Sequence, residues 1–199
     1  MRISSLLPFI PLLVSAQLSL PENALEGFGI HLSDDSGRTI YVHESEFESY
    51  GISVVAAGSY VNGTSSDADT TNSTSLTERG LPVGDAMYCD NSQSFWIEDL
   101  HSNMIQFSDY MLCNFEVSIN PTDPFRFEAA SYYLGTSVIY LCNYSGKSRV
   151  TGSYDMFRFL YQVFEHCGES NIGGWYYQGS TQMSWGYTSS TAGYCGPPQ

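Results

Sequence analysis

The chain has 199 residues with 21 acidic and 7 basic side chains, which gives a formal net charge of −14 at pH 7. A surface this acidic repels phosphate backbones, so the composition argues against nucleic acid as a partner held by charge. No segment beyond the first twenty residues contains the roughly 20 successive apolar residues that a spanning helix needs, so we predict no membrane insertion.

The first sixteen residues have the layout of a secretory signal peptide. Arg2 supplies a positive start, an apolar stretch follows over 6–14, and the small residues Ser15 and Ala16 precede Gln17. The apolar stretch is short and carries two prolines, which is typical of a cleaved signal and not of a membrane anchor. We therefore expect residues 1–16 to be removed and the mature protein to be secreted and extracellular, where disulfides form.

Residues 17–62 make up an acidic segment without cysteine, and two interpretations of it remain open. Strands predicted at 38–43 and 51–57, both rich in β-branched side chains, would form a hairpin on the main sheet. Alternatively, the whole segment is a pro-region or spacer. Residues 63–84 form a Ser/Thr-rich linker or loop with too little apolar surface to fold, and the cysteine-containing domain is expected over 85–196.

Three Asn-x-Ser/Thr tripeptides agree with export. They predict N-linked glycans in the mature protein, and the acceptor residues are Asn62, Asn72 and Asn143.

The cysteine-containing region alternates helix and strand patterns. Helical spacing covers 105–117, and period-two alternation predicts a strand at 125–129. Residues 137–144 are apolar on both faces, which is typical of a central strand.

The clearest helix is predicted over 153–167 and is followed by two strands at 174–177 and 182–187. Gly168 is a natural stop for the helix. Five side chains of the helix fall on one apolar stripe: Met156, Leu160, Val163, Phe164 and Cys167. The order predicts an α+β fold, in which one main amphipathic helix packs on an antiparallel sheet as a disulfide-stabilised α/β sandwich.

The last two predicted strands carry an aromatic cluster. Alternation places Trp175 with Tyr177 on one face of the first strand, and Trp185 with Tyr187 on one face of the second. These rings are either core beneath the helix or an exposed platform for a sugar or a protein partner. The intervening positions, such as Tyr176, are small or polar-tipped and resemble a solvent-facing side, which favours the core.

We identify no catalytic set, metal site or cofactor site in the sequence. His43 and Glu44 form a histidine beside an acid at the end of a predicted strand, but successive strand residues point to opposite faces. Residues 67–78 approximate the spacing of a calcium-binding loop, yet they lack the glycine that its turn needs at the sixth position.

The cysteines number five, so one thiol has no partner within the chain. Cys167 is the candidate for this unpaired thiol, because it lies on the apolar stripe of the predicted helix and can serve there as a small apolar residue. The sequence leaves the pairing of the others open.

The order of the other four cysteines and their neighbours resembles a known family: Tyr88-Cys89-Asp90-Asn91-Ser92, Ser108-Asp109 with Cys113, Cys142 at the end of a strand, and Cys195 after an aromatic, glycine-rich strand. The pattern is similar to that of fungal secreted effectors of the necrosis-inducing-factor family and, more loosely, to killer-toxin-like folds. Two features depart from the family. Asp109 and Cys113 are four residues apart where family members have them adjacent, and Cys167 has no place in a four-cysteine pattern.

The resemblance implies a secreted fungal protein without a catalytic centre, bridged between Cys89 and Cys113 and between Cys142 and Cys195. We expect a non-enzymatic effector or toxin-like protein that binds an unknown surface protein or glycan of a host or competing microbe. The alternatives are a carbohydrate-binding module that uses the aromatic strands, and a small secreted hydrolase.

Overall fold

The computed structural model describes residues 17–55, 85–92, 94–111, 116–118, 125–145, 154–168 and 173–196. The predictions that concern the signal peptide, the linker, the calcium-like spacing, Asn62, Asn72 and Cys113 lie outside these residues.

Seven antiparallel strands form the main sheet, in the order β2-β1-β6-β7-β9-β8-β4. Their bounds are β1 Gly27–Ser33, β2 Thr39–His43, β4 Ala86–Asp90, β6 Arg126–Leu134, β7 Ser137–Asn143, β8 Gly173–Gln178 and β9 Met183–Ser189. A second sheet pairs β3 (Ser53–Val55) with β5 (Glu116–Ser118). The helical elements are the 3-10 helix η1 (Glu44–Tyr50) and the α-helices α1 (Ile97–Met111) and α2 (Tyr154–Cys167). The predicted α+β class with an antiparallel sheet is confirmed.

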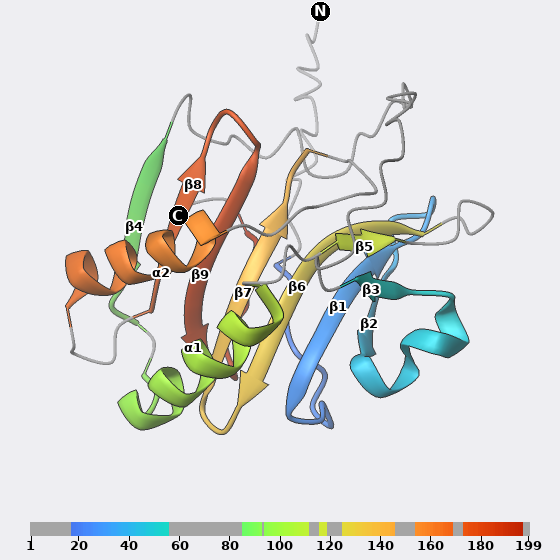
Figure 1. Cartoon of the computed structure of the whole chain (residues 1–199), viewed down its shortest axis with the longest axis horizontal. Coiled ribbons are helices and arrows are strands. Elements are labelled where there is room, and N and C mark those ends of the chain that lie inside the picture. The colour runs from blue at the N-terminus through green and yellow to red at the C-terminus, as the bar shows by residue number, and fades with distance from the viewer. Residues whose placement is uncertain are drawn as a thin grey trace, which may run out of the picture.

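Both α-helices lie on one side of the main sheet, which we call the helix face (Figure 1). Helix α1 packs on β6 and β7, and α2 packs on β4, β8 and β9. The core between these layers includes Phe28, Ile139, Leu160, Val163 and Trp185. The apolar stripe that predicts α2 therefore faces the sheet, as amphipathic spacing requires.

Strand β7 is the central strand that its composition predicts. All seven of its residues are buried, and it pairs with β6 on one side and β9 on the other. Helix α2 also ends where expected, since Gly168 adopts a positive φ of 82° and its N–H donates to the Phe164 carbonyl at 3.0 Å.

Helix α1 begins eight residues before the predicted start at 105. Its buried positions are Leu100, Asn103, Met104 and Phe107, whereas Ile105 is 62% exposed. The prediction used the wrong apolar stripe, because it took Ile105 as an inward-facing residue.

The N-terminal segment supplies two strands of the main sheet. Strand β2 lies within the predicted range 38–43, but its partner is β1, which pairs in turn with β6. The predicted hairpin is wrong, because the strand expected at 51–57 contributes β3 to the separate sheet with β5. Residues on both sides of the predicted linker therefore share one sheet.

Two disulfides connect the main sheet to its surroundings. Cys142 in β7 is joined to Cys195, the pair that the resemblance implies, across a separation of 53 residues. Cys89 in β4 is joined to Cys167 at the end of α2, across 78 residues. The pairing of Cys89 with Cys113 and the unpaired state of Cys167 are therefore both wrong. A cysteine on the apolar stripe of α2 faces the sheet, and this orientation brings its sulfur to β4.

We predict that Cys89→Ala/Cys167→Ala and Cys142→Ala/Cys195→Ala each lower the free energy of unfolding by about 4 kcal/mol, because each removes a cross-link that closes a long loop. Urea denaturation measures the loss. Cys113→Ala serves as the control, since this residue belongs to neither bridge and should leave both intact. A non-reduced digest that yields a Cys89–Cys113 peptide would contradict the assignment.

Candidate functional site

The side of the sheet opposite the helices is covered by the two ends of the described chain, and we call it the terminal face. Leu18 and Tyr194 form a β-bridge there, with N–H to carbonyl distances of 2.9 and 2.7 Å. Together with Tyr140, Tyr144 and Tyr177 they belong to a second buried cluster, separate from the core under the helices. Segments that are far apart in sequence therefore build this face together.

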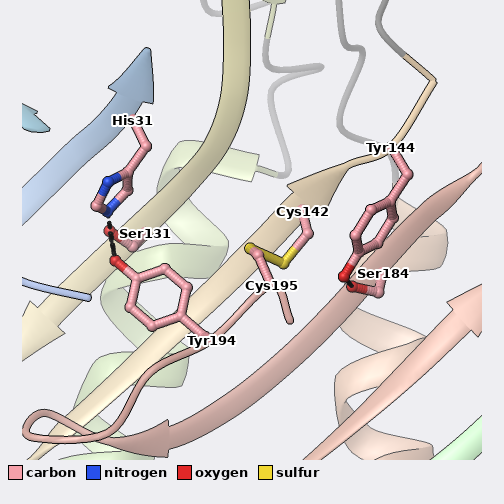
Figure 2. Close-up of a disulfide and its surroundings, with 7 residues drawn as sticks. All are labelled: His31, Ser131, Cys142, Tyr144, Ser184, Tyr194 and Cys195. Atoms are coloured by element: carbon pink, nitrogen blue, oxygen red, sulfur yellow. Dashed lines mark hydrogen bonds between the residues drawn. A yellow bond between two sulfur atoms is a disulfide. The ribbon is translucent and has the colours of Figure 1, made fainter. Parts of the chain in front are cut away.

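The C-terminal segment is fixed to the terminal face by a bridge and by polar contacts (Figure 2). Next to the Cys142–Cys195 disulfide, the Tyr194 ring stacks on Tyr140 with centroids 4.9 Å apart. The Tyr194 hydroxyl lies 2.6 Å from His31 Nε2 and 3.4 Å from Ser131 Oγ. The segment that carries Tyr194 is thus held by a disulfide, by ring stacking and by hydrogen bonds.

His31 is 2% exposed, and burial lowers the pKa of its imidazole to about 4. The neighbouring Tyr194 is buried as well, and its pKa is raised for the same reason. Both groups are therefore neutral across the physiological range, and their hydrogen bond joins two uncharged partners. A pKa of about 4 makes the His31 imidazole a weak base, so the pair fits a positioning role for the C-terminal segment.

The predicted aromatic cluster is divided between the two faces of the sheet. Tyr176 pairs with Trp185 across β8 and β9, which puts Trp185 and Tyr187 on the helix face, where both are buried. Trp175 and Tyr177 lie on the terminal face. The four rings do not form one platform. Tyr176, expected on the solvent side, stacks on Phe159 of α2 at 4.5 Å.

A cleft of about 330 Å³ lies on the terminal face, and we call it the β4–β8 cleft. Its wall is an aromatic pair, because Tyr88 of β4 is directly opposite Trp175 of β8 and their rings stack with centroids 4.4 Å apart. Both rings are half-buried. Gln17 and the Gly193–Gly196 segment contribute to the opposite side.

Glycine at position 186 shapes the floor next to this wall. Gly186 lies between Trp175 and Tyr140 in the cross-strand row, and a Cβ there would be 2.6 Å from the Tyr140 hydroxyl. The Tyr140 ring can therefore lie over the backbone of β9. Gly29 plays the same part in β1, where a Cβ would be 2.2 Å from the Tyr41 hydroxyl.

One end of the cleft is polar. Asp90 of β4 is opposite Gly173, and the Thr188 hydroxyl is 3.2 Å from the position that a Cβ of Gly173 would occupy. Asp90 Oδ1 accepts bonds from the Ser92 N–H at 2.9 Å and the Ser92 hydroxyl at 2.6 Å. The arrangement combines an aromatic wall with a fixed carboxylate and a hydroxyl, and it can bind a ligand that has both an apolar surface and hydroxyl groups.

A larger and more open hollow of about 1020 Å³ lies between residues 17–25 and strand β2. His43 lines it, and its ring nitrogens are occupied by Ser45 Oγ at 2.8 Å and the Glu26 carbonyl at 3.1 Å. The expectation that His43 and Glu44 point to opposite faces is wrong, because both side chains lie against Gly27. The strand ends at His43, so alternation does not extend to Glu44.

Asn143 does not fit the role of glycan acceptor in the folded protein. Its side chain is 1% exposed, and its Nδ2 donates to the Phe127 carbonyl at 2.9 Å. The amide oxygen accepts from the Ser145 N–H and hydroxyl. A sugar on this nitrogen would displace a buried hydrogen bond of the sheet, so the fold leaves no room for it.

Sequence reasoning missed most of the cleft. Trp175 and Tyr187 are the two members of the predicted surface among its lining residues, while Tyr88, Asp90, Thr188 and Gln17 were not singled out as binding residues. The period-two alternation of Tyr88 and Asp90 beside Cys89 was a usable signal, since it places both on the face opposite the Cys89 bridge.

Comparison of the chain with protein-family models, with curated proteins and with solved structures finds no match. Within the described residues, no group of three or more His, Cys, Asp or Glu side chains could hold a metal ion. Across the same part of the chain, no helix has the length and apolar character to cross a bilayer.

We predict that His31 makes the protein less stable as the pH falls from about 6.5 to about 4. In this window the unfolded chain binds a proton on His31 that the folded protein does not bind, so up to about 3 kcal/mol of unfolding free energy is lost. Urea titrations at pH 7 and pH 4 measure the loss of unfolding free energy. The same titrations of His31→Gln give the part of the loss that is due to the carboxylates, which both proteins share. An equal stability difference between the two proteins at both pH values would contradict the assignment.

Proposed function

We propose that the chain is a secreted, non-enzymatic effector-type protein that binds a target on a host or competing microbe in the β4–β8 cleft. The observation that carries this proposal is the cleft itself. Its aromatic wall is built on paired strands, and the Cys142–Cys195 bridge fixes the segment across from it. Rigid aromatic surface binds partners at a low entropic cost.

The lining of the cleft favours binding over catalysis. Among the described residues, Asp90 is its one carboxylate and no histidine lines it. Glycoside hydrolysis generally needs two carboxyl groups, and acyl transfer needs a nucleophile beside a base. The fixed Asp90 therefore serves best as a hydrogen-bond acceptor.

We propose that the chain is exported, on the basis of its disulfides and of the signal-peptide pattern in its first sixteen residues. Two disulfides are compatible with an oxidising, extracellular compartment. We base the fungal origin and the action on a host or competitor on the order of the cysteines, which resembles that of the effector family although Cys89 pairs with Cys167 and not with Cys113.

We predict that Trp175→Ala weakens binding of the labelled protein to leaf protoplasts or yeast cells at least tenfold, because it removes the larger ring of the cleft wall. Flow cytometry over a concentration series measures the affinity. Trp96→Ala is the matched control, since Trp96 lies outside the cleft just before α1 and is 69% exposed.

Equal binding by wild type and Trp175→Ala would contradict the use of this cleft. A hydrolytic activity that is lost in Asp90→Asn would show an enzyme and overturn the proposal.

A further inference from the structure

We infer that the ligand of the β4–β8 cleft is a neutral saccharide, with one pyranose ring against the wall of Tyr88 and Trp175 and its hydroxyls bonded to Asp90 and Thr188. This inference rests on the proposed function, since it names the chemical class that the same cleft takes.

The wall matches the apolar side of a sugar. A pyranose presents C–H groups on its faces and hydroxyls around its rim, so it needs an apolar surface bordered by polar groups. Tyr88 is directly opposite Trp175 and stacks on one face of its ring, so the other face of Trp175, towards Gly186 in the cross-strand row, is the apolar surface for the sugar. The rings lose little freedom when a ligand binds.

The polar end matches the rim of the sugar. Two bonds from Ser92 hold Asp90 through Oδ1, and its Oδ2 has no hydrogen-bond partner within the described part of the chain. An ionised carboxylate only accepts hydrogen bonds, and bonds to it are stronger than those between neutral groups. The Thr188 hydroxyl can donate or accept a hydrogen bond. Asp90 and Thr188 together can therefore bind sugar hydroxyls that act as donors and sugar oxygens that act as acceptors.

Charge excludes the acidic sugars. The chain carries a net charge of −14, Asp90 places a negative group at the cleft, and no lysine or arginine is among the described lining residues. A uronic acid, sulfated sugar or phosphorylated sugar would be repelled. The volume of about 330 Å³ is at the lower end of ligand pockets, which suits one or two neutral rings of a longer chain.

The experiment titrates four neutral probes into the full mature chain: cellotetraose, tetra-N-acetylchitotetraose, laminaritetraose and mannotetraose. Calorimetry gives the affinity, and the three tryptophan indole N–H signals in an NMR spectrum report the place of binding. We expect at least one probe to bind and to shift the Trp175 signal while leaving that of Trp96 in place. Trp175→Ala should weaken this binding at least tenfold, Asp90→Asn should also weaken it, and Trp96→Ala should match the wild type.

Absence of binding by all four probes at 10 mM (roughly the weak limit of specific recognition) overturns the inference, as does binding that Trp175→Ala and Asp90→Asn leave unchanged. Asp90→Asn covers the case in which loss of the Trp175 ring disturbs the fold, because Asp90 is an exposed residue. The result separates this inference from the proposed function. If cell binding depends on Trp175 but no probe binds, the sugar assignment is wrong and the cleft still binds a target. If cell binding does not depend on Trp175, the proposed function is wrong.

Discussion

The inner strands β1, β7 and β9 of the main sheet are buried on both faces, whereas the two α-helices cover only one face. A sheet with an uncovered apolar face would aggregate or lose stability, so the other face needs a separate cover. Here that cover comes from the two ends of the described chain, joined at the Leu18–Tyr194 bridge. One disulfide secures each cover: Cys89–Cys167 ties α2 to β4, and Cys142–Cys195 ties the C-terminal segment to β7. The cleft exists because the second cover is a narrow segment and leaves part of the terminal face open.

The terminal face also depends on residues that have no side chain. Tyr41 lies over Gly29, and Tyr140 lies over Gly186. Both positions require glycine, since a Cβ there would collide with the tyrosine hydroxyl. The aromatic rings can thus lie close to the backbone of the sheet, and the segments that cross the terminal face can pack on top of them. Tyr194 packs in this way, because its ring stacks on Tyr140 and its hydroxyl forms a hydrogen bond with His31. Packing at this face therefore combines bulky rings with bare backbone, as close packing of an interior requires.

The sequence predicts the parts of the fold that depend on local patterns. The central strand β7, the helix α2 and the β8–β9 pair all follow from periodicity. Strand β1 was missed although Phe28, Ile30 and Leu32 alternate with Gly29, His31 and Ser33, which is the pattern of a strand with one apolar face. The aromatic cluster shows a different limit. Alternation groups rings within one strand correctly, but only the pairing of Tyr176 with Trp185 decides which groups share a face. The same limit applies to Cys167, whose partner depends on how α2 lies across β4, and to a cleft that needs Gln17 and Tyr88 side by side.

The Leu18–Tyr194 bridge joins residues that lie 176 positions apart in the sequence (194 − 18), and this separation has a consequence for the order of folding. A ribosome delivers Leu18 well before Tyr194, so the segment that carries Leu18 cannot form this bridge until Tyr194 has been synthesised. Contacts between such distant residues form slowly, because a long loop must close before they can repay the lost entropy. The strands and helices up to Ser189 can pair before this bridge forms. The cleft is then completed after the main sheet, and a chain that stops before Gly193 would lack the segment across from the aromatic wall.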